Sequence, residues 1–136
     1  MYKGIKMEKV INQVSVVPYY FDNGIKKIIL ITARNPRRNW IVPKGHIEKE
    51  LSPEKSAAKE AFEEAGLKGN LKPEIIGSLF YKKKDKEYQV DFYPFEITEI
   101  LNDWPEKKSR ERIAVEQSYA GRFVLDEKLL EILKLV

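Results

Sequence analysis

Runs of hydrophobic residues divide the chain into several segments typical of β-strands and a smaller number typical of helices. Residues 10–21 (VINQVSVVPYYF) and 27–32 (KIILIT) are rich in β-branched and aromatic side chains, and Asp22-Asn23-Gly24 between them is typical of a tight turn. Together these segments predict a β-hairpin. Similar patterns predict a short strand at 40–43 and two antiparallel strands at 74–81 and 87–98, joined by a charged turn at 82–86.

A helix is predicted over residues 52–65, because suitable residues stand at both of its ends. Ser52 is a good N-cap, Pro53 suits the first helical position, and Gly66 suits the left-handed residue beyond the last turn. At 100° per residue, one face of this helix is apolar and is expected to face the core: it carries Ala58, Ala61, Phe62 and Ala65.

A second amphipathic helix is predicted at the end of the chain, over residues 125–136. Its core contacts are expected from Leu129, Leu130, Ile132 and Leu133. Residues 33–39 and 68–73 are predicted to be loops, and 101–112 is polar with no clear period. Strands, a helix, more strands and a final helix indicate an α+β protein, and we expect one domain over residues 1–136.

The composition is ordinary for a water-soluble protein and narrows the function only slightly. Of the 136 residues, 43% are hydrophobic and 34% are charged, and no apolar run approaches the roughly 18 residues of a membrane span. The first ten residues lack the apolar centre of a secretory signal, and there is no cysteine, so we expect a cytoplasmic protein. The net charge of +4 mildly favours anionic ligands and is too small to indicate duplex nucleic acid.

Three carboxylates share one face of the first predicted helix. Glu60, Glu63 and Glu64 occupy positions i, i+3 and i+4, where like charges repel one another. A divalent cation would convert this repulsion into binding, because Mg²⁺ and Mn²⁺ prefer carboxylate oxygens. The alternative is a solvated acidic surface, since glutamate-rich helix faces are common.

The spacing around these carboxylates distinguishes between the two interpretations. Residues 45–67 (GHIEKELSPEKSAAKEAFEEAGL) resemble the Nudix box, G-x5-E-x7-R-E-U-x-E-E-x-G-U, where U is an aliphatic residue. Two positions depart from it: Leu51 stands where the family has its first glutamate, and Lys59 where it has arginine. A lysine retains a cation beside the glutamates but lacks the bidentate fork of arginine. The matching positions are Gly45, Glu60, Glu63, Glu64, Gly66 and Leu67, with Ala61 at the first aliphatic position.

The resemblance implies a fold, an activity and a set of site residues. It implies the Nudix fold, a mixed β-sheet sandwiched between α-helices, and hydrolysis of nucleoside diphosphate derivatives with Mg²⁺ or Mn²⁺. Glu60, Glu63 and Glu64 would bind the metal and carry the catalysis, and the carbonyl of Gly45 would add a ligand. A distant carboxylate would take a proton from water, and Glu111 is our candidate; a surface pairing of Glu111 with neighbouring arginines is the alternative.

Basic residues near the box are candidates for binding substrate phosphates. Arg34 and Arg38 precede it, and Lys44 adjoins its first glycine, so these three are the predicted substrate contacts. The lysines of the predicted 82–86 turn are better explained as solvated turn residues. His46 is the only histidine and is expected to orient the loop rather than to perform chemistry.

The start of the box suggests a branch of the family. The residues Trp40-x-x-Pro43-Lys44-Gly45-His46-x-Glu48, with a later Trp104-Pro105-Glu106, resemble diadenosine polyphosphate and diphosphoinositol polyphosphate hydrolases. Dinucleoside or nucleoside polyphosphates are therefore the expected substrates. A non-catalytic nucleotide-binding module and an RNA 5′-pyrophosphohydrolase are the alternatives, and the sequence does not decide the oligomeric state.

Overall fold

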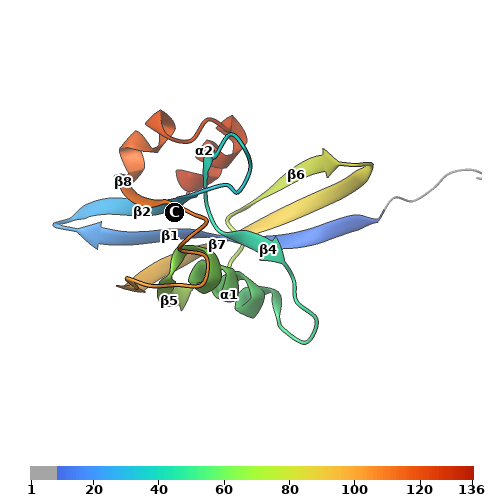
Figure 1. Cartoon of the computed structure of the whole chain (residues 1–136), viewed down its shortest axis with the longest axis horizontal. Coiled ribbons are helices and arrows are strands. Elements are labelled where there is room, and N and C mark those ends of the chain that lie inside the picture. The colour runs from blue at the N-terminus through green and yellow to red at the C-terminus, as the bar shows by residue number, and fades with distance from the viewer. Residues whose placement is uncertain (1–8) are drawn as a thin grey trace, which may run out of the picture.

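The computed structural model describes residues 9–136, in which a mixed sheet lies between helices on its two sides (Figure 1). The helical elements are α1 (Pro53–Ala65), the 3₁₀ helix η1 (Gln117–Arg122) and α2 (Glu127–Leu133). The strands are β1 (Val10–Asp22), β2 (Ile25–Thr32), β3 (Trp40–Ile41), β4 (Lys44–His46), β5 (Leu67–Leu71), β6 (Gly77–Lys83), β7 (Lys86–Ile100) and β8 (Arg112–Glu116).

The long strands β1 and β7 form the centre of the sheet. They pair in parallel from Val10 opposite Glu87 to Tyr19 opposite Glu96, while β1 also pairs antiparallel with β2 and β4. The predicted β1–β2 hairpin is confirmed, and Asn23 and Gly24 both have the positive φ that its two-residue turn requires. Strand β7 in turn carries β5 and β6 as antiparallel partners, and β3 and β8 flank β2.

Two hydrophobic clusters, one on each face of the sheet, bind the helices to it. On one face Ala57, Ala61 and Ala65 of α1 pack against a cluster that includes Ile29 and Phe95. On the other face α2 and η1 cover a second cluster, to which the buried Leu129, Ile132 and Leu133 belong. The predicted α+β class, with a mixed sheet between helices, is therefore confirmed; a single domain over 1–136 stays a prediction.

The predicted caps of α1 are confirmed. The Ser52 hydroxyl accepts a hydrogen bond from the Lys55 amide, and Gly66 has φ +66° and ψ +39° with its amide bonded to the last turn. The predicted apolar face is partly wrong, because Phe62 is 38% exposed and Ala57 lies at the sheet in its place. The sheet contacts a slightly rotated face of the helix, on which small residues allow close approach.

Several segment boundaries also differ from the sequence expectation. Residues 68–73 were expected to be a loop, but strand β5 occupies most of them. At Gly69 a side chain would overlap the backbone of Glu96, so the glycine permits this close strand pairing. Strand β6 begins at Gly77 rather than at 74, and α2 is shorter than predicted. Strand β8 was not predicted from the sequence. Neither α-helix of residues 9–136 has the length and apolar sequence that a membrane crossing needs.

Candidate metal and phosphate site

The site forms where strand β4 meets the middle of helix α1. A Cβ atom built on Gly45 would overlap the Glu60 side chain, so the absence of a side chain at position 45 lets the carboxylate lie against the strand backbone. Next to it, the Lys44 amide donates to Glu64 Oε1 at 3.1 Å. Strand and helix thus place Glu60 and Glu64 together at the predicted position.

Glu60 and Glu64 are close enough to share a proton. Burial, a hydrogen bond with Glu64 and the charges of Glu64, Glu63 and Glu106 together raise the pKa of Glu60 to about 8. Burial also raises the pKa of Glu64, although the hydrogen bond with Glu60, the charge of Arg110 and the Lys44 amide act in the opposite direction. Burial and mutual repulsion therefore disfavour the state in which both carboxylates are ionised.

The third carboxylate of the predicted set is held differently. Glu63 lies 3.3 Å from the ammonium of Lys59, which also contacts Glu48 at 2.7 Å. The expectation that Lys59 still pairs with a glutamate of the box is confirmed. Glu54, three residues after Leu51, lies near Tyr93 instead: burial and then the charge of Glu54 raise the pKa of the Tyr93 phenol.

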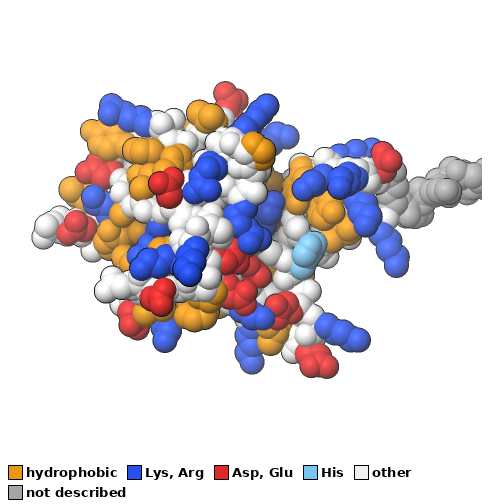
Figure 2. All heavy atoms as spheres, viewed as in Figure 1, with side chains coloured by type: hydrophobic (Ala, Val, Ile, Leu, Met, Phe, Trp, Pro, Cys, Tyr) orange, Lys and Arg blue, Asp and Glu red, His pale blue; other side chains and the backbone are white. Residues whose placement is uncertain are grey.

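The donor atoms at this site fit a hard divalent cation. Within residues 9–136 the side chains do not form a ready-made cluster of three or more metal-ligating groups, because Glu63 is turned towards Lys59. The two carboxylates that do converge offer oxygen donors beside the backbone of Gly45, and Mg²⁺ and Mn²⁺ prefer such ligands. Figure 2 shows acidic side chains gathered beside α1 with lysine and arginine side chains around them.

Residues 101–112 hold the C-terminal half of α1 in place, a role that their polar sequence does not predict. The indole of Trp104 donates to the Glu64 carbonyl at 3.1 Å, and the Glu106 amide donates to the Glu63 carbonyl at 3.1 Å. Arg112 lies over the Trp104 ring, with its guanidinium carbon 4.0 Å from the ring centroid, and donates to the Ala65 carbonyl. This segment therefore fixes the last turn of α1, which carries Glu63 and Glu64.

The least expected member of the site is Arg110, whose side chain is only 6% exposed. Its guanidinium lies 3.3 Å from Glu64 Oε2 and 2.9 Å from Glu106 Oε1, and it also donates to the Thr32 carbonyl at 2.9 Å. Arg110 thus links Glu64 to a fourth carboxylate, Glu106. In the sequence, Trp104-Pro105-Glu106 indicated only a branch of the family, and the distal carboxylate predicted there was Glu111 rather than Glu106.

The two predicted arginines lie beside different carboxylates: Arg34 beside Glu106 and Arg38 beside the predicted distal carboxylate, Glu111. Arg34 lies 3.6 Å from Glu106 and therefore borders the site. Arg38 donates to the Thr32 hydroxyl and lies 3.8 Å from Glu111, whose side chain is 71% exposed. Glu111 is thus exposed and lies beside Arg38, not beside the arginines next to it in sequence, while Glu106 lies near the carboxylate pair.

Lys44 connects the carboxylates to the β6–β7 hairpin. Its ammonium lies over the Tyr81 ring, 4.7 Å from the centroid, and Tyr81 in turn stacks on Tyr88 and donates to Gln13. Although much of the side chain is exposed, desolvation of the ammonium lowers the pKa of Lys44. The Lys84-Asp85 turn of this hairpin is exposed and has positive φ at both residues, which agrees with its interpretation as a solvated turn.

Comparison with known proteins identifies the family to which the chain belongs. The family model of the NUDIX domain matches residues 12–124. The chain is 36% identical over 83 residues to diphosphoinositol polyphosphate phosphohydrolase 3-beta of Bos taurus, covering 61% of this chain and 49% of that protein. It is 33% identical over 96 residues to diphosphoinositol polyphosphate phosphohydrolase 2 of Rattus norvegicus, covering 68% of this chain and 52% of that protein.

Among solved structures, the fold is similar to that of a C. elegans Ap4A hydrolase in a binary complex. The TM-score is 0.79 at 21% identity, with 92% of this chain and 93% of that chain covered. This chain spans about half the length of the curated relatives that it matches. The fold, the box on α1 and the family match together show that the chain belongs to the NUDIX domain family.

Proposed function

We propose that this protein hydrolyses the pyrophosphate linkage of nucleoside diphosphate derivatives, with dinucleoside or nucleoside polyphosphates as substrates and Mg²⁺ or Mn²⁺ as cofactor. The observation that carries the proposal is the adjacent carboxylates of Glu60 and Glu64, with Glu60 against Gly45 and Glu64 bonded to the Lys44 amide. Family membership and the names of the curated relatives, which are phosphohydrolases, support it. A cytoplasmic location, where such nucleotides occur, is part of the proposal.

In this proposal Glu60, Glu63 and Glu64 bind the cation through carboxylate oxygens, and the Gly45 carbonyl adds a ligand. When bound, the cation supplies charge neutralisation at the phosphate oxygens and a water molecule of lowered pKa. Recruitment of Glu63 requires its carboxylate to leave Lys59, a contact that is partly exposed and therefore weak. Arg110 favours the charged form of Glu64 and holds its carboxylate in place.

Three basic side chains are proposed to hold the substrate phosphates. Lys44 is best supported, because its amide bonds to Glu64 while its ammonium reaches outward over Tyr81. Arg34 borders the site through Glu106, and Arg38 lies one step further out beside Glu111. Positive groups at increasing distance from the carboxylates suit a substrate with a chain of phosphates.

A carboxylate outside the helix is proposed to accept the proton of the attacking water. Glu111 was the candidate from the sequence. The geometry supports Glu106 better, because its charge acts on both Glu60 and Glu64 and Arg110 and Arg34 hold it at the site. A base that lies within reach of the reacting water is the first requirement for this role.

The test is product release from dinucleoside polyphosphates, nucleotide sugars, nucleoside triphosphates and triphosphorylated RNA, with Mg²⁺, with Mn²⁺ and with EDTA. Glu63→Gln and Glu64→Gln are the test variants, and Glu131→Gln, at an exposed position on α2, is the control. The proposal predicts metal-dependent cleavage that both test variants lose and the control keeps. Retained nucleotide binding without cleavage of any substrate would instead indicate a binding module.

A further inference from the structure

The loop between β2 and β3, residues 33–39, contains a backbone conformation that its sequence does not favour. Arg38 has φ +49°, in the left-handed region that residues with a long side chain rarely adopt. Asn23 in the β1–β2 turn and Lys84 in the β6–β7 turn also have positive φ, but tight hairpin turns require it. A longer loop has no such requirement, so the conformation of Arg38 needs another explanation.

Several contacts hold Arg38 in this conformation. Its amide donates to the carbonyl of Asn35 at 3.1 Å and to the side-chain oxygen of the same residue at 2.8 Å. The Ala33 amide closes the loop by donating to the Asn39 carbonyl at 2.7 Å. At the far end of the Arg38 side chain, Nη2 donates to the hydroxyl of Thr32 at 3.2 Å. The backbone and the side chain of Arg38 are therefore both fixed before any ligand binds.

Thr32, the last residue of β2, is only 1% exposed and connects this loop to the carboxylates. Its hydroxyl accepts from the Glu111 amide at 2.9 Å as well as from Arg38. Its carbonyl accepts from Arg110 at 2.9 Å, and Arg110 in turn lies 3.3 Å from Glu64 Oε2. One buried residue thus sets the position of Arg38 relative to Glu64.

The contacts that Arg38 makes within the protein are too weak to account for its strained backbone. Its guanidinium lies 3.8 Å from Glu111, whose side chain is 71% exposed, and an exposed pair at that distance contributes little to stability. The contacts with Glu111 and Thr32 both use Nη2, and 46% of the Arg38 side chain is exposed, so the rest of the guanidinium is accessible to a ligand. Strained residues that their surroundings hold firmly are concentrated at ligand-binding sites, and a planar guanidinium suits a phosphate group.

We propose that Thr32 and Asn35 are positioning residues that hold Arg38 in place for a phosphate of the substrate, an inference that rests on the proposed function. Because the guanidinium is already fixed, binding a phosphate costs little further side-chain freedom. Arg38 is the outermost of the proposed phosphate contacts, so its bond is the same before and during cleavage. It therefore lowers KM and leaves kcat unchanged.

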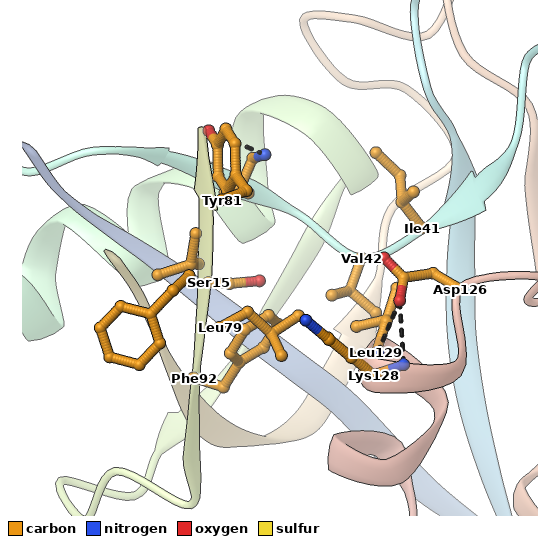
Figure 3. Close-up of a pocket in the computed structure, with 12 residues that line it drawn as sticks. Ser15, Ile41, Val42, Leu79, Tyr81, Phe92, Asp126, Lys128 and Leu129 are labelled. Atoms are coloured by element: carbon orange, nitrogen blue, oxygen red, sulfur yellow. Dashed lines mark hydrogen bonds between the residues drawn. The ribbon is translucent and has the colours of Figure 1, made fainter. Parts of the chain in front are cut away.

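The cavity in Figure 3 is a separate part of the molecule. Ile41 and Val42, which follow the loop in the chain, line this cavity between the sheet and α2. Neither Thr32 nor Arg38 is among the residues of the described chain that line it. A change at Thr32 therefore alters phosphate binding without changing the cavity.

Binding of inorganic tripolyphosphate in EDTA, measured by calorimetry, tests this positioning without hydrolysis. We expect Arg38→Ala to weaken binding by about tenfold and Thr32→Val by at least about threefold, since a charge-assisted bond is lost or misaligned. Thr32→Ser keeps the hydroxyl and should bind within about twofold of the unchanged protein. Arg37→Ala, at an exposed position of the same loop, removes the same charge and should also stay within about twofold.

Double variants distinguish positioning from a general effect on the fold. In the Arg38→Ala protein, Thr32→Val and Asn35→Ala should each change binding by less than about 1.5-fold, because residues that act through Arg38 have no effect without it. Asn35 is exposed, so Asn35→Ala provides the test if Thr32→Val does not fold. Losses that multiply in the double variants, or Arg38→Ala binding as well as Arg37→Ala, would overturn the inference.

Hydrolysis of diadenosine tetraphosphate with Mg²⁺ separates this inference from the proposed function. We expect Thr32→Val to raise KM by at least about threefold and to keep kcat within about twofold, because the backbone carbonyl at position 32 still holds Arg110. A fall in kcat at unchanged KM would place the effect at Arg110 and overturn the inference while leaving a pyrophosphohydrolase. Coupled binding losses in a protein that hydrolyses no substrate would contradict the proposed function and retain the inference.

Discussion

Arg110 is the residue whose removal should show most clearly how this site is held together. Its side chain is 6% exposed and contacts Glu64 at 3.3 Å, Glu106 at 2.9 Å and the Thr32 carbonyl at 2.9 Å. Arg110→Met keeps an apolar side chain of similar length and removes the charge and all three contacts. The Glu64 carboxylate, whose side chain is 9% exposed, is then left without its guanidinium partner.

The expected loss in the free energy of unfolding arises because the Glu64 charge is left buried without a partner. Removing one member of a buried ion pair costs about 3–5 kcal/mol, because the remaining charge is buried without compensation. For a domain of this size, that corresponds to a fall in melting temperature of about 10–20 °C. By contrast, the exposed Lys134–Glu131 pair, at 3.1 Å, contributes less than about 1 kcal/mol, so Lys134→Met is the matched control.

Urea unfolding in EDTA, followed by tryptophan fluorescence, measures both variants. The double variant Arg110→Met/Glu64→Gln should recover much of the lost stability, because it removes the stranded charge. The loss in Arg110→Met should also shrink as the pH falls from about 8 to about 5, since the buried carboxylate can then take up a proton. An Arg110→Met variant no less stable than Lys134→Met would refute this reasoning.

Three further outcomes are expected. Gly45→Ala places a methyl group against the Glu60 carboxylate and should abolish metal-dependent activity. Gly77→Ala, also in a strand, is the control and should keep the activity. Equal activities of the two variants would contradict the close packing at position 45. If Glu106 accepts the proton of the attacking water, Glu106→Gln should lower kcat by about 10²-fold or more, and Glu111→Gln should lower it by less than about threefold. The reverse order would support Glu111 as the proton acceptor. Metal-free protein should lose stability as the pH rises from about 4.5 towards 8, because the raised pKa of Glu60 means that the folded state binds its proton more tightly than the unfolded state. Glu60→Gln should remove this fall in EDTA melts, and a flat profile in the unchanged protein would argue against the raised pKa.

The features predicted correctly from the sequence are those that depend on neighbouring residues. The N-cap at Ser52, the left-handed Gly66 and the turn at Asn23-Gly24 follow from local backbone chemistry. The spacing of Glu60 and Glu64 likewise places them on one helix face, and the structure brings them together.

The features that sequence reasoning missed depend on contacts between distant segments. Strand β5 contains Gly69 and Asn70, which disfavour a strand, and forms because β7 offers a partner. Arg110 resembles any surface arginine in a polar segment until packing places it between Glu64 and Glu106. The exposure of Phe62 depends on the rotation of α1 against the sheet, which the helical period alone leaves open.

The parallel pairing of β1 with β7 also determines when the site can form during folding. Paired residues in these strands are 77 positions apart, and the segment between them contains β4 and α1. Closing so long a loop costs chain entropy before any contact between the two strands compensates for it. Gly45 reaches Glu60 only when β4 has paired with β1, and α1 has docked on the sheet that β1 and β7 build. We therefore expect the proposed metal site to form late in folding, so a cation that binds it would stabilise the finished protein without guiding the early steps.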